Sequence, residues 1–160
     1  MVQVLFVCLG NICRSPTAEG VFRGRVEQAG LTDDITVDSA GTGGWHIGDP
    51  PDSRAQAAAR ARGYDLSRQR ARQVRAADFD RFDYVIAMDR RNHADLAMLA
   101  GSAGQERIHL FLDFAPATGV TEVPDPYYGG GDGFAQVLDL VEAASAGLLD
   151  DIRRNHLAGN

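Results

Sequence analysis

A near-continuous apolar run at residues 2–7 gives way to a short loop and then to a helix start, and this change constrains the fold most. An apolar run of this length is typical of a parallel strand that is covered on both faces. Ser15 and Pro16 predict the helix start, with Ser15 as the N-cap and Pro16 in the first helical position, where a missing N–H is harmless. The first 16 residues therefore predict a buried strand, a tight loop and a helix.

The loop between this strand and helix has the residue types of a phosphate-binding loop that holds a nucleophile. Cys8 and Arg14 lie six positions apart, so a thiolate and a guanidinium can meet on one tetrahedral anion. Gly10 and Asn11 tolerate positive φ, which lets successive backbone amides point at the anion. The helix N-terminus also favours negative charge, including the thiolate form of Cys8. The alternative for Cys8 is a small buried hydrophobic residue at a strand end.

Three further apolar segments, at residues 35–40, 84–88 and 108–111, predict strands. Helices are predicted from Pro16, over about 53–62, over 92–100 and from Phe134 onward. This alternation predicts a single-domain α/β fold over residues 1–160, a three-layer sandwich with a four-stranded, parallel, doubly wound sheet and helices on both faces. Such sheets bind ligands at the carboxyl ends of their strands. On loops at that edge we expect Cys8, Ser39 with Trp45, Asp89 and Asp125.

The charged residues exclude several classes of protein. All 16 basic residues are Arg, against 22 acidic residues, and the formal net charge of −6 argues against nucleic-acid binding and a polybasic membrane anchor. The absence of Lys excludes a nucleotide-binding loop of the Gly-Lys-Ser/Thr kind. Two cysteines do not form a disulfide framework, and no apolar stretch approaches the ~20 residues that span a bilayer, so we expect a cytoplasmic protein. The bias toward Arg, Ala and Gly favours a bacterial source.

The segment Val7-Cys8-Leu9-Gly10-Asn11-Ile12-Cys13-Arg14-Ser15-Pro16 resembles the signature loop of the low-molecular-weight protein-tyrosine phosphatases. Matching segments follow in the family's order at residues 38–42, 71–73, 83–84, 88–89 and 125–128, so the resemblance covers essentially the whole chain. It implies an enzyme without metal or other cofactor that acts on phosphotyrosine-containing proteins or peptides and releases inorganic phosphate. We expect a monomer or weak self-association.

The resemblance assigns roles to three residues. Cys8 would attack the phosphate ester and form a phosphocysteine, while Arg14 and the loop amides hold the phosphate oxygens. Asp125 would donate a proton to the leaving phenolate and then deprotonate the attacking water. The alternative for Asp125 is an ordinary turn residue, because Pro-Asp-Pro is common turn chemistry.

Other residues are expected to shape or support this site. The phosphate-binding loop comprises Leu9, Gly10, Asn11, Ile12, Cys13, Arg14 and Ser15. The polar residues Asn11, Ser15, Ser39 and Asp89 would support it, although Asp89 is equally explained as a helix N-cap. Apolar walls for a phenyl ring are expected from Ile12, Trp45, Tyr127 and Tyr128, with core packing as the alternative. Cys13 is either a small loop filler or a redox partner that traps oxidised Cys8, as the resemblance implies.

One departure from the family and three competing functions remain. The family often has His where Gln69 stands, which leaves the electrostatics of the loop open.

Arsenate reductases need further cysteines, and none follows Cys13. Protein-arginine phosphatases carry Thr where this chain has Ile12, and the larger apolar residue favours tyrosine. A phosphopeptide-binding module without turnover would have lost Cys8 or Asp125, and both are present.

Overall fold

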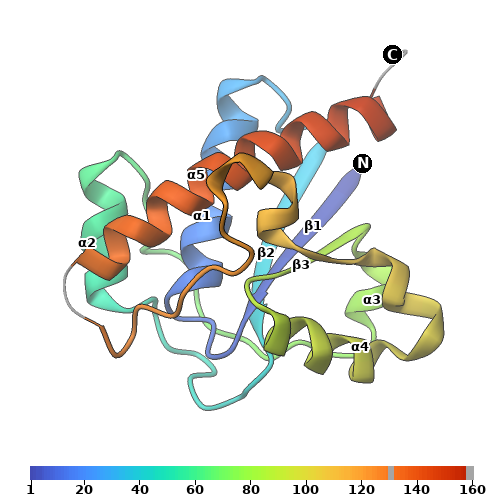
Figure 1. Cartoon of the computed structure of the whole chain (residues 1–160), viewed down its shortest axis with the longest axis horizontal. Coiled ribbons are helices and arrows are strands. Elements are labelled where there is room, and N and C mark those ends of the chain that lie inside the picture. Colours follow the sequence, from blue (N-terminus) through green and yellow to red (C-terminus); the bar gives the residue numbers. More distant parts are fainter. Residues whose placement is uncertain (130–131, 158–160) are drawn as a thin grey trace.

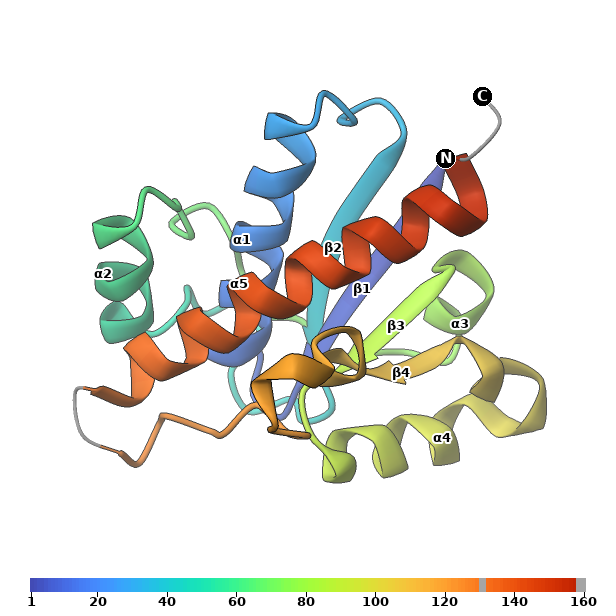
Figure 2. The same cartoon turned by 45° about the horizontal axis from the view of Figure 1, so that its top comes forward.

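The computed structural model describes residues 1–129 and 132–157 and contains one parallel sheet. Its strands are β1 (Val2–Cys8), β2 (Ile35–Gly41), β3 (Tyr84–Ala87) and β4 (Ile108–Leu110). They lie in the order β2-β1-β3-β4, and every neighbouring pair is parallel (Figure 1 labels the first three, and Figure 2 all four). The predicted four-stranded, doubly wound sheet is confirmed, and each strand ends within one residue of its predicted end.

Helices cover both faces of the sheet. One face packs on α1 (Arg14–Gln28) and α5 (Asp132–Ile152), and Figure 2 shows α5 crossing over α1 and the strands. The other face packs on α3 (Asp78–Arg81) and α4 (Arg90–Gly104). The side chains of β1 alternate between the two cores, because successive residues of a strand point to opposite faces. Val4 and Phe6 join the α1/α5 core, whereas Leu5 and Val7 join the α3/α4 core.

Helix α1 does not begin as predicted. Its first residue is Arg14, its N-cap is Cys13, and no side chain caps it, so the prediction of Ser15 as N-cap is wrong. The hydroxyl of Ser15 is bound instead by Cys8 and Asn11 and is therefore not available to the helix amides. The other end agrees with the prediction, since Gly30 follows the helix with φ of 71°, a left-handed conformation that glycine adopts without strain.

The remaining elements are α2, the interrupted part of α4 and four short helical turns. Helix α2 (Ser53–Ala61) is capped by Asp52, whose carboxylate accepts from the Arg54 amide. Helix α4 is longer than predicted, and Gly101 interrupts it with φ of 67°. Short 3-10 turns η1 (Gln105–Arg107), η2 (Phe111–Phe114) and η3 (Pro116–Thr118) follow, and the π-helical turn η4 (Arg153–Leu157) follows α5. None of the helices in the described ranges is long and apolar enough to cross a membrane.

Candidate active site

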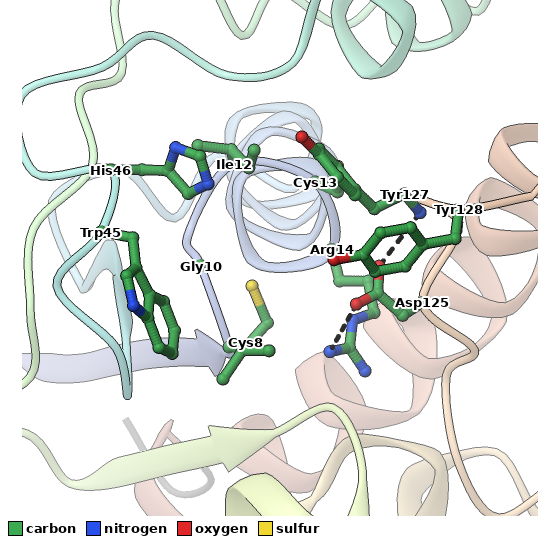
Figure 3. Close-up of a pocket in the computed structure, with 11 residues that line it drawn as sticks. Cys8, Gly10, Ile12, Cys13, Arg14, Trp45, His46, Asp125, Tyr127 and Tyr128 are labelled. Carbon is green, nitrogen blue, oxygen red and sulfur yellow. Dashed lines mark hydrogen bonds and ion pairs between the residues drawn. The ribbon is translucent and has the colours of Figure 1, made fainter.

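Cys8 is the last residue of β1, and its sulfur lies at the floor of a pocket at the carboxyl edge of the sheet (Figure 3). The side chain is buried. The backbone amide of Asn11 donates to Sγ at 3.3 Å, and the Ser15 hydroxyl lies 3.0 Å from the same atom. One polar hydrogen, that of the Asn11 amide, therefore points at the sulfur, and the Ser15 hydroxyl lies within reach as a second donor.

Asn11 fixes the curvature of the loop. It has φ of 58° and is the only residue other than glycine with positive φ in residues 1–129 and 132–157. Its amide nitrogen Nδ2 donates to Ser15 Oγ at 2.8 Å and to Ser39 Oγ at 3.0 Å, and its Oδ1 accepts from the Arg72 amide at 3.0 Å. These bonds offset the strain of a left-handed conformation at a residue with a side chain.

Gly10 serves a different purpose from the predicted one. Positive φ at Gly10 is not observed, so that expectation is wrong. A Cβ atom at this position would lie 3.2 Å from Cδ2 of His46, closer than most real contacts. Gly10 therefore permits the close approach of the His46 ring, which borders the same pocket. His46 is not among the predicted site residues, although it stands beside Trp45 in a Gly/Pro-rich loop.

Ser39 lies within β2 and not on the loop that follows it, which corrects the prediction. Its Oγ accepts from Asn11 and donates to Oε1 of Glu19 at 2.7 Å. Glu19 is buried on α1 and also pairs with Arg23 at 2.8 Å. Burial raises the pKa of Glu19, although hydrogen bonding from Ser39 and the charge of Arg23 oppose this. No pattern in the sequence points to Glu19, because an acidic residue on a helix is ordinarily solvated.

Arg14 is buried behind the loop, with 3% of its side chain exposed, and is held by two other strand-end loops. Its Nη1 donates to Asp89 Oδ2 at 2.6 Å and to the Val123 carbonyl at 3.1 Å. Asp89 also caps α4, because its Oδ1 accepts from the Asn92 amide at 2.8 Å. Asp89 therefore makes both of the contacts that the sequence suggests: Oδ2 supports the loop through Arg14, and Oδ1 caps α4.

Asp125 stands at the mouth of the pocket on the segment between η3 and α5. Its Oδ2 lies 3.7 Å from Nη2 of Arg14, and its Oδ1 accepts from the Tyr127 amide at 3.1 Å. The second contact is a local turn of the kind that the alternative interpretation predicts. The carboxylate is nevertheless partly exposed and borders the pocket opposite Trp45, as Figure 3 shows.

The pocket has a volume of about 340 Å³, within the range of small-molecule sites. Trp45 forms one wall with 72% of its surface exposed, and Tyr127 and Tyr128 form the opposite wall with ring centroids 4.9 Å apart. Gly43 makes room for the indole, because a Cβ there would lie 1.9 Å from the ring. The lining comprises Cys8, Leu9, Gly10, Ile12, Cys13, Arg14, Trp45, His46, Asp125, Tyr127 and Tyr128.

Arg54, which is not among the predicted site residues, links α2 to the segment that carries Asp125. Its Nη2 donates to the Tyr127 carbonyl at 3.2 Å and to Asp52 at 2.9 Å. Its guanidinium carbon lies 5.5 Å from the centroid of the Tyr127 ring and 4.9 Å from that of Phe134. A planar cation can combine ion pairing with stacking in this way.

Cys13 contacts α2 and α5, and Gln69 contacts α1. Cys13 is buried against Ala55 and Phe134, and burial, with the nearby charge of Asp52, raises its pKa to about 12. Both cysteines are free thiols. Gln69 donates through Nε2 to the Pro16 carbonyl at 2.9 Å, which anchors it to α1. Its influence on the electrostatics of the loop stays a prediction.

The chain is similar to known proteins in sequence and in structure. The sequence matches the family described as low molecular weight phosphotyrosine protein phosphatase over residues 3–158. It is 50% identical over 154 residues to the low molecular weight protein-tyrosine-phosphatase of Streptomyces coelicolor, covering 94% of this chain and 93% of that protein. A protein tyrosine phosphatase from Entamoeba histolytica, solved with Hepes in its active site, has a TM-score of 0.94 at 40% identity, covering 96% and 98% of the two chains. YfkJ from Bacillus subtilis has a TM-score of 0.93 at 44% identity, covering 98% and 97%.

Proposed function

Since the chain belongs to the low molecular weight phosphotyrosine protein phosphatase family and is a protein-tyrosine phosphatase, we propose that its reaction passes through a phosphocysteine on Cys8. The observation that carries this proposal is the position of Cys8 Sγ at the floor of the pocket. There Sγ accepts a hydrogen bond from the Asn11 backbone amide at 3.3 Å and faces Arg14 and Asp125. We take residues 1–160 as a single phosphatase domain.

In the first step the Cys8 thiolate attacks phosphorus and the bond to the phenolic oxygen breaks. The loop amides and Arg14 hold the remaining oxygens, where charge shifts during the transfer. Asp125 gives its proton to the leaving oxygen, which matches its place at the pocket mouth. Asp125 then takes a proton from water as that water attacks the phosphocysteine, and inorganic phosphate leaves.

The supporting residues would act by orienting hydrogens toward Cys8. Asn11 donates to Ser15 Oγ, so the single hydrogen of that hydroxyl is left for Cys8 Sγ at 3.0 Å or the Ala40 carbonyl at 3.4 Å. The nearer acceptor is the sulfur. Ser39 in turn fixes the amide of Asn11, and Asp89 holds Arg14. We assign all four residues to positioning and none to direct chemistry.

The walls of the pocket support a preference for aryl phosphates. Trp45 and the Tyr127–Tyr128 pair rise above the loop on opposite sides and can contact both faces of a phenyl ring (Figure 3). A phosphoserine side chain is shorter, so its phosphate would reach Cys8 only if the peptide backbone entered the pocket. Ile12 adds apolar surface to the floor.

The proposal is tested by comparing rates on phosphotyrosine, phosphoserine and phosphoarginine peptides with wild type, Cys8→Ser and Cys13→Ser. We expect turnover of phosphotyrosine alone, complete loss in Cys8→Ser with phosphate binding retained, and substantial activity in Cys13→Ser. A chelator should have no effect, because Arg14 and the loop amides supply the positive charge. Turnover by Cys8→Ser would contradict the covalent mechanism, and faster phosphoarginine hydrolysis would reassign the substrate.

A further inference from the structure

A second hollow of about 520 Å³ lies beside the catalytic pocket and shares the walls formed by Leu9 and Trp45. We call it the α4 groove, because one of its sides is the exposed face of α4. Its lining comprises Leu9, Thr42, Gly43, Trp45, Gln73, Val74, Arg91, Asp95, Met98 and Leu99. The proposed reaction uses only the two shared residues.

The α4 side of the groove is one helical face. Arg91, Asp95, Met98 and Leu99 are spaced at i, i+4, i+7 and i+8, which places them on one stripe of a helix. Met98 is 85% exposed and Leu99 is 42% exposed, whereas Leu96 is buried in the core. The apolar part of this stripe is therefore not used to pack the fold.

Exposed apolar side chains gather at this edge of the molecule. Eight large apolar side chains are exposed in the described part of the chain, and five of them line the pocket or the groove. These five are Trp45, Met98, Leu99, Tyr127 and Tyr128. Such an apolar surface that continues from a catalytic pocket is typical of a binding site.

We propose that the α4 groove binds the segment of a phosphoprotein substrate next to its phosphotyrosine and prefers a large apolar side chain there. This inference rests on the proposed function. A phosphotyrosine seated between Trp45 and the tyrosine pair leaves the peptide backbone at the rim of the pocket. An extended peptide advances ~3.3 Å per residue, so a neighbouring side chain can pass Trp45 and enter the adjoining groove.

The polar members of the stripe suit a peptide better than a second folded protein. Arg91 and Asp95 are exposed, and neither has an ion-pair partner among the described residues. Their opposite charges lie one turn apart and can meet the carbonyl and amide groups of an extended backbone. Met98 and Leu99 lie beyond them and form the apolar end of the same face.

The test compares host phosphotyrosine peptides in which a single Leu replaces Ala at each of the three positions on either side. Wild type is measured beside Met98→Ala/Leu99→Ala and beside Val120→Ala, which removes an exposed apolar side chain outside both hollows. We expect Leu at one or two positions to raise kcat/KM about three- to tenfold, and the double variant to lose this gain. Val120→Ala should keep it.

A small aryl phosphate, p-nitrophenyl phosphate, separates this proposal from the proposed function. It lacks a peptide, so the double variant should hydrolyse it at the wild-type rate. Equal rates for all peptides, or a Leu preference that survives in the double variant, would overturn the groove while leaving the reaction intact. Loss of a concentration-dependent dimer in the double variant, with peptide preference unchanged, would assign the groove to self-association and would also overturn the proposal.

Binding without turnover gives a second measurement. Trp45 is the only Trp of the chain and forms the wall between pocket and groove, so its fluorescence reports on both. In a Cys8→Ser background, the Leu-containing peptide should bind about three- to tenfold more tightly than its Ala counterpart, and Met98→Ala/Leu99→Ala should remove the difference. Equal affinities in the Cys8→Ser protein would contradict the proposal.

Discussion

Asp89 holds Arg14 with one carboxylate oxygen and caps α4 with the other. Oδ2 accepts from Arg14 Nη1 at 2.6 Å, and Oδ1 accepts from the Asn92 amide at 2.8 Å. The end of β3 is thereby connected to the guanidinium that faces Cys8. Because the same group serves stability and positioning, two substitutions should separate its effects.

Asp89→Asn keeps an oxygen that can cap α4 but removes the charge beside Arg14. We expect kcat/KM on an aryl phosphate to fall about tenfold, because the buried guanidinium loses a charged partner, with only a small change in the unfolding free energy. Asp89→Ala should lose activity to a similar extent and, in addition, about 1 kcal/mol of stability with the cap. Steady-state kinetics and urea unfolding measure the two effects. Equal stability losses in both variants would contradict the division between the oxygens.

Arg54 should control the acid step through the Tyr127 carbonyl that it binds at 3.2 Å. Arg54→Gln loosens the segment that carries Asp125, so hydrolysis of substrates with poor leaving groups should slow more than that of good ones. Asp125→Ala removes the acid itself and should give the largest loss of rate, ~10²- to 10⁴-fold for poor leaving groups. Arg60→Gln, at an exposed position on the same helix, is the matched control and should behave as wild type. Uniform losses across the leaving-group series would exclude a positioning role for Arg54.

Glu19 should make stability depend on pH. Burial raises its pKa above the ordinary value of 4.5, so the folded state binds a proton more tightly than the unfolded state. Its stabilising contribution is therefore complete below pH 4.5 and is lost as pH rises through the higher pKa of the folded state. Glu19→Gln cannot ionise, and its stability relative to wild type should increase with pH over that interval. Urea unfolding of both proteins at several pH values tests this, and parallel curves would contradict it.

Replacement by Ala should lower the stability of the fold at Gly147 and raise it at Gly24. A Cβ at Gly147 would lie 1.8 Å from the Phe114 carbonyl oxygen, a backbone atom that cannot move aside. Gly147→Ala should therefore destabilise the fold by ~1 to 3 kcal/mol, despite a helix-propensity gain of about 1 kcal/mol. At Gly24 a Cβ would contact the Tyr64 ring at 3.4 Å, an ordinary separation. Gly24→Ala should stabilise the fold by ~0.5 to 1 kcal/mol, and thermal unfolding measures both.

The sheet and its functional edge were predictable because their signals are local. Each strand is a short apolar run, and parallel pairing then brings Cys8, Asp89 and the Asp125 segment to one edge whatever the details of packing. The chain positions of Cys8 and Arg14 likewise fixed the loop between β1 and α1.

The residues that sequence reasoning missed depend on contacts between distant parts of the chain. Glu19 lies on a helix surface until β2 supplies Ser39, 20 residues later, and Arg54 meets the Tyr127 carbonyl across 73 residues. The helix cap predicted at Ser15 fails for a different reason, because the competing partners lie only seven and four residues away in the same loop. Its local sequence predicts a cap, but Cys8 and Asn11 bind the hydroxyl instead.

Cys13 should trap oxidised Cys8 slowly at neutral pH. Peroxide would convert the Cys8 thiolate to a sulfenic acid, and the Cys13 thiolate would then attack that sulfur, form a disulfide and release hydroxide. Burial, with the charge of Asp52, raises the pKa of Cys13 to about 12, so only a very small fraction of the molecules carries this thiolate at pH 7. The rate of disulfide formation should therefore rise about tenfold per pH unit between pH 6 and 9.

The measurement is mass spectrometry of peroxide-treated protein, quenched with an alkylating agent at several pH values. The wild type should recover activity with thiol reductant, and more completely when oxidised at higher pH, because the disulfide then forms before Cys8 is oxidised further. Cys13→Ser has no second thiol and should become progressively unrecoverable at every pH. Equal recovery of both proteins, or no Cys8–Cys13 bond in the inactivated wild type, would reject the redox role of Cys13. A bond that forms at a rate independent of pH would instead show that opening of the contacts with Ala55 and Phe134 limits the reaction, not ionisation of the thiol.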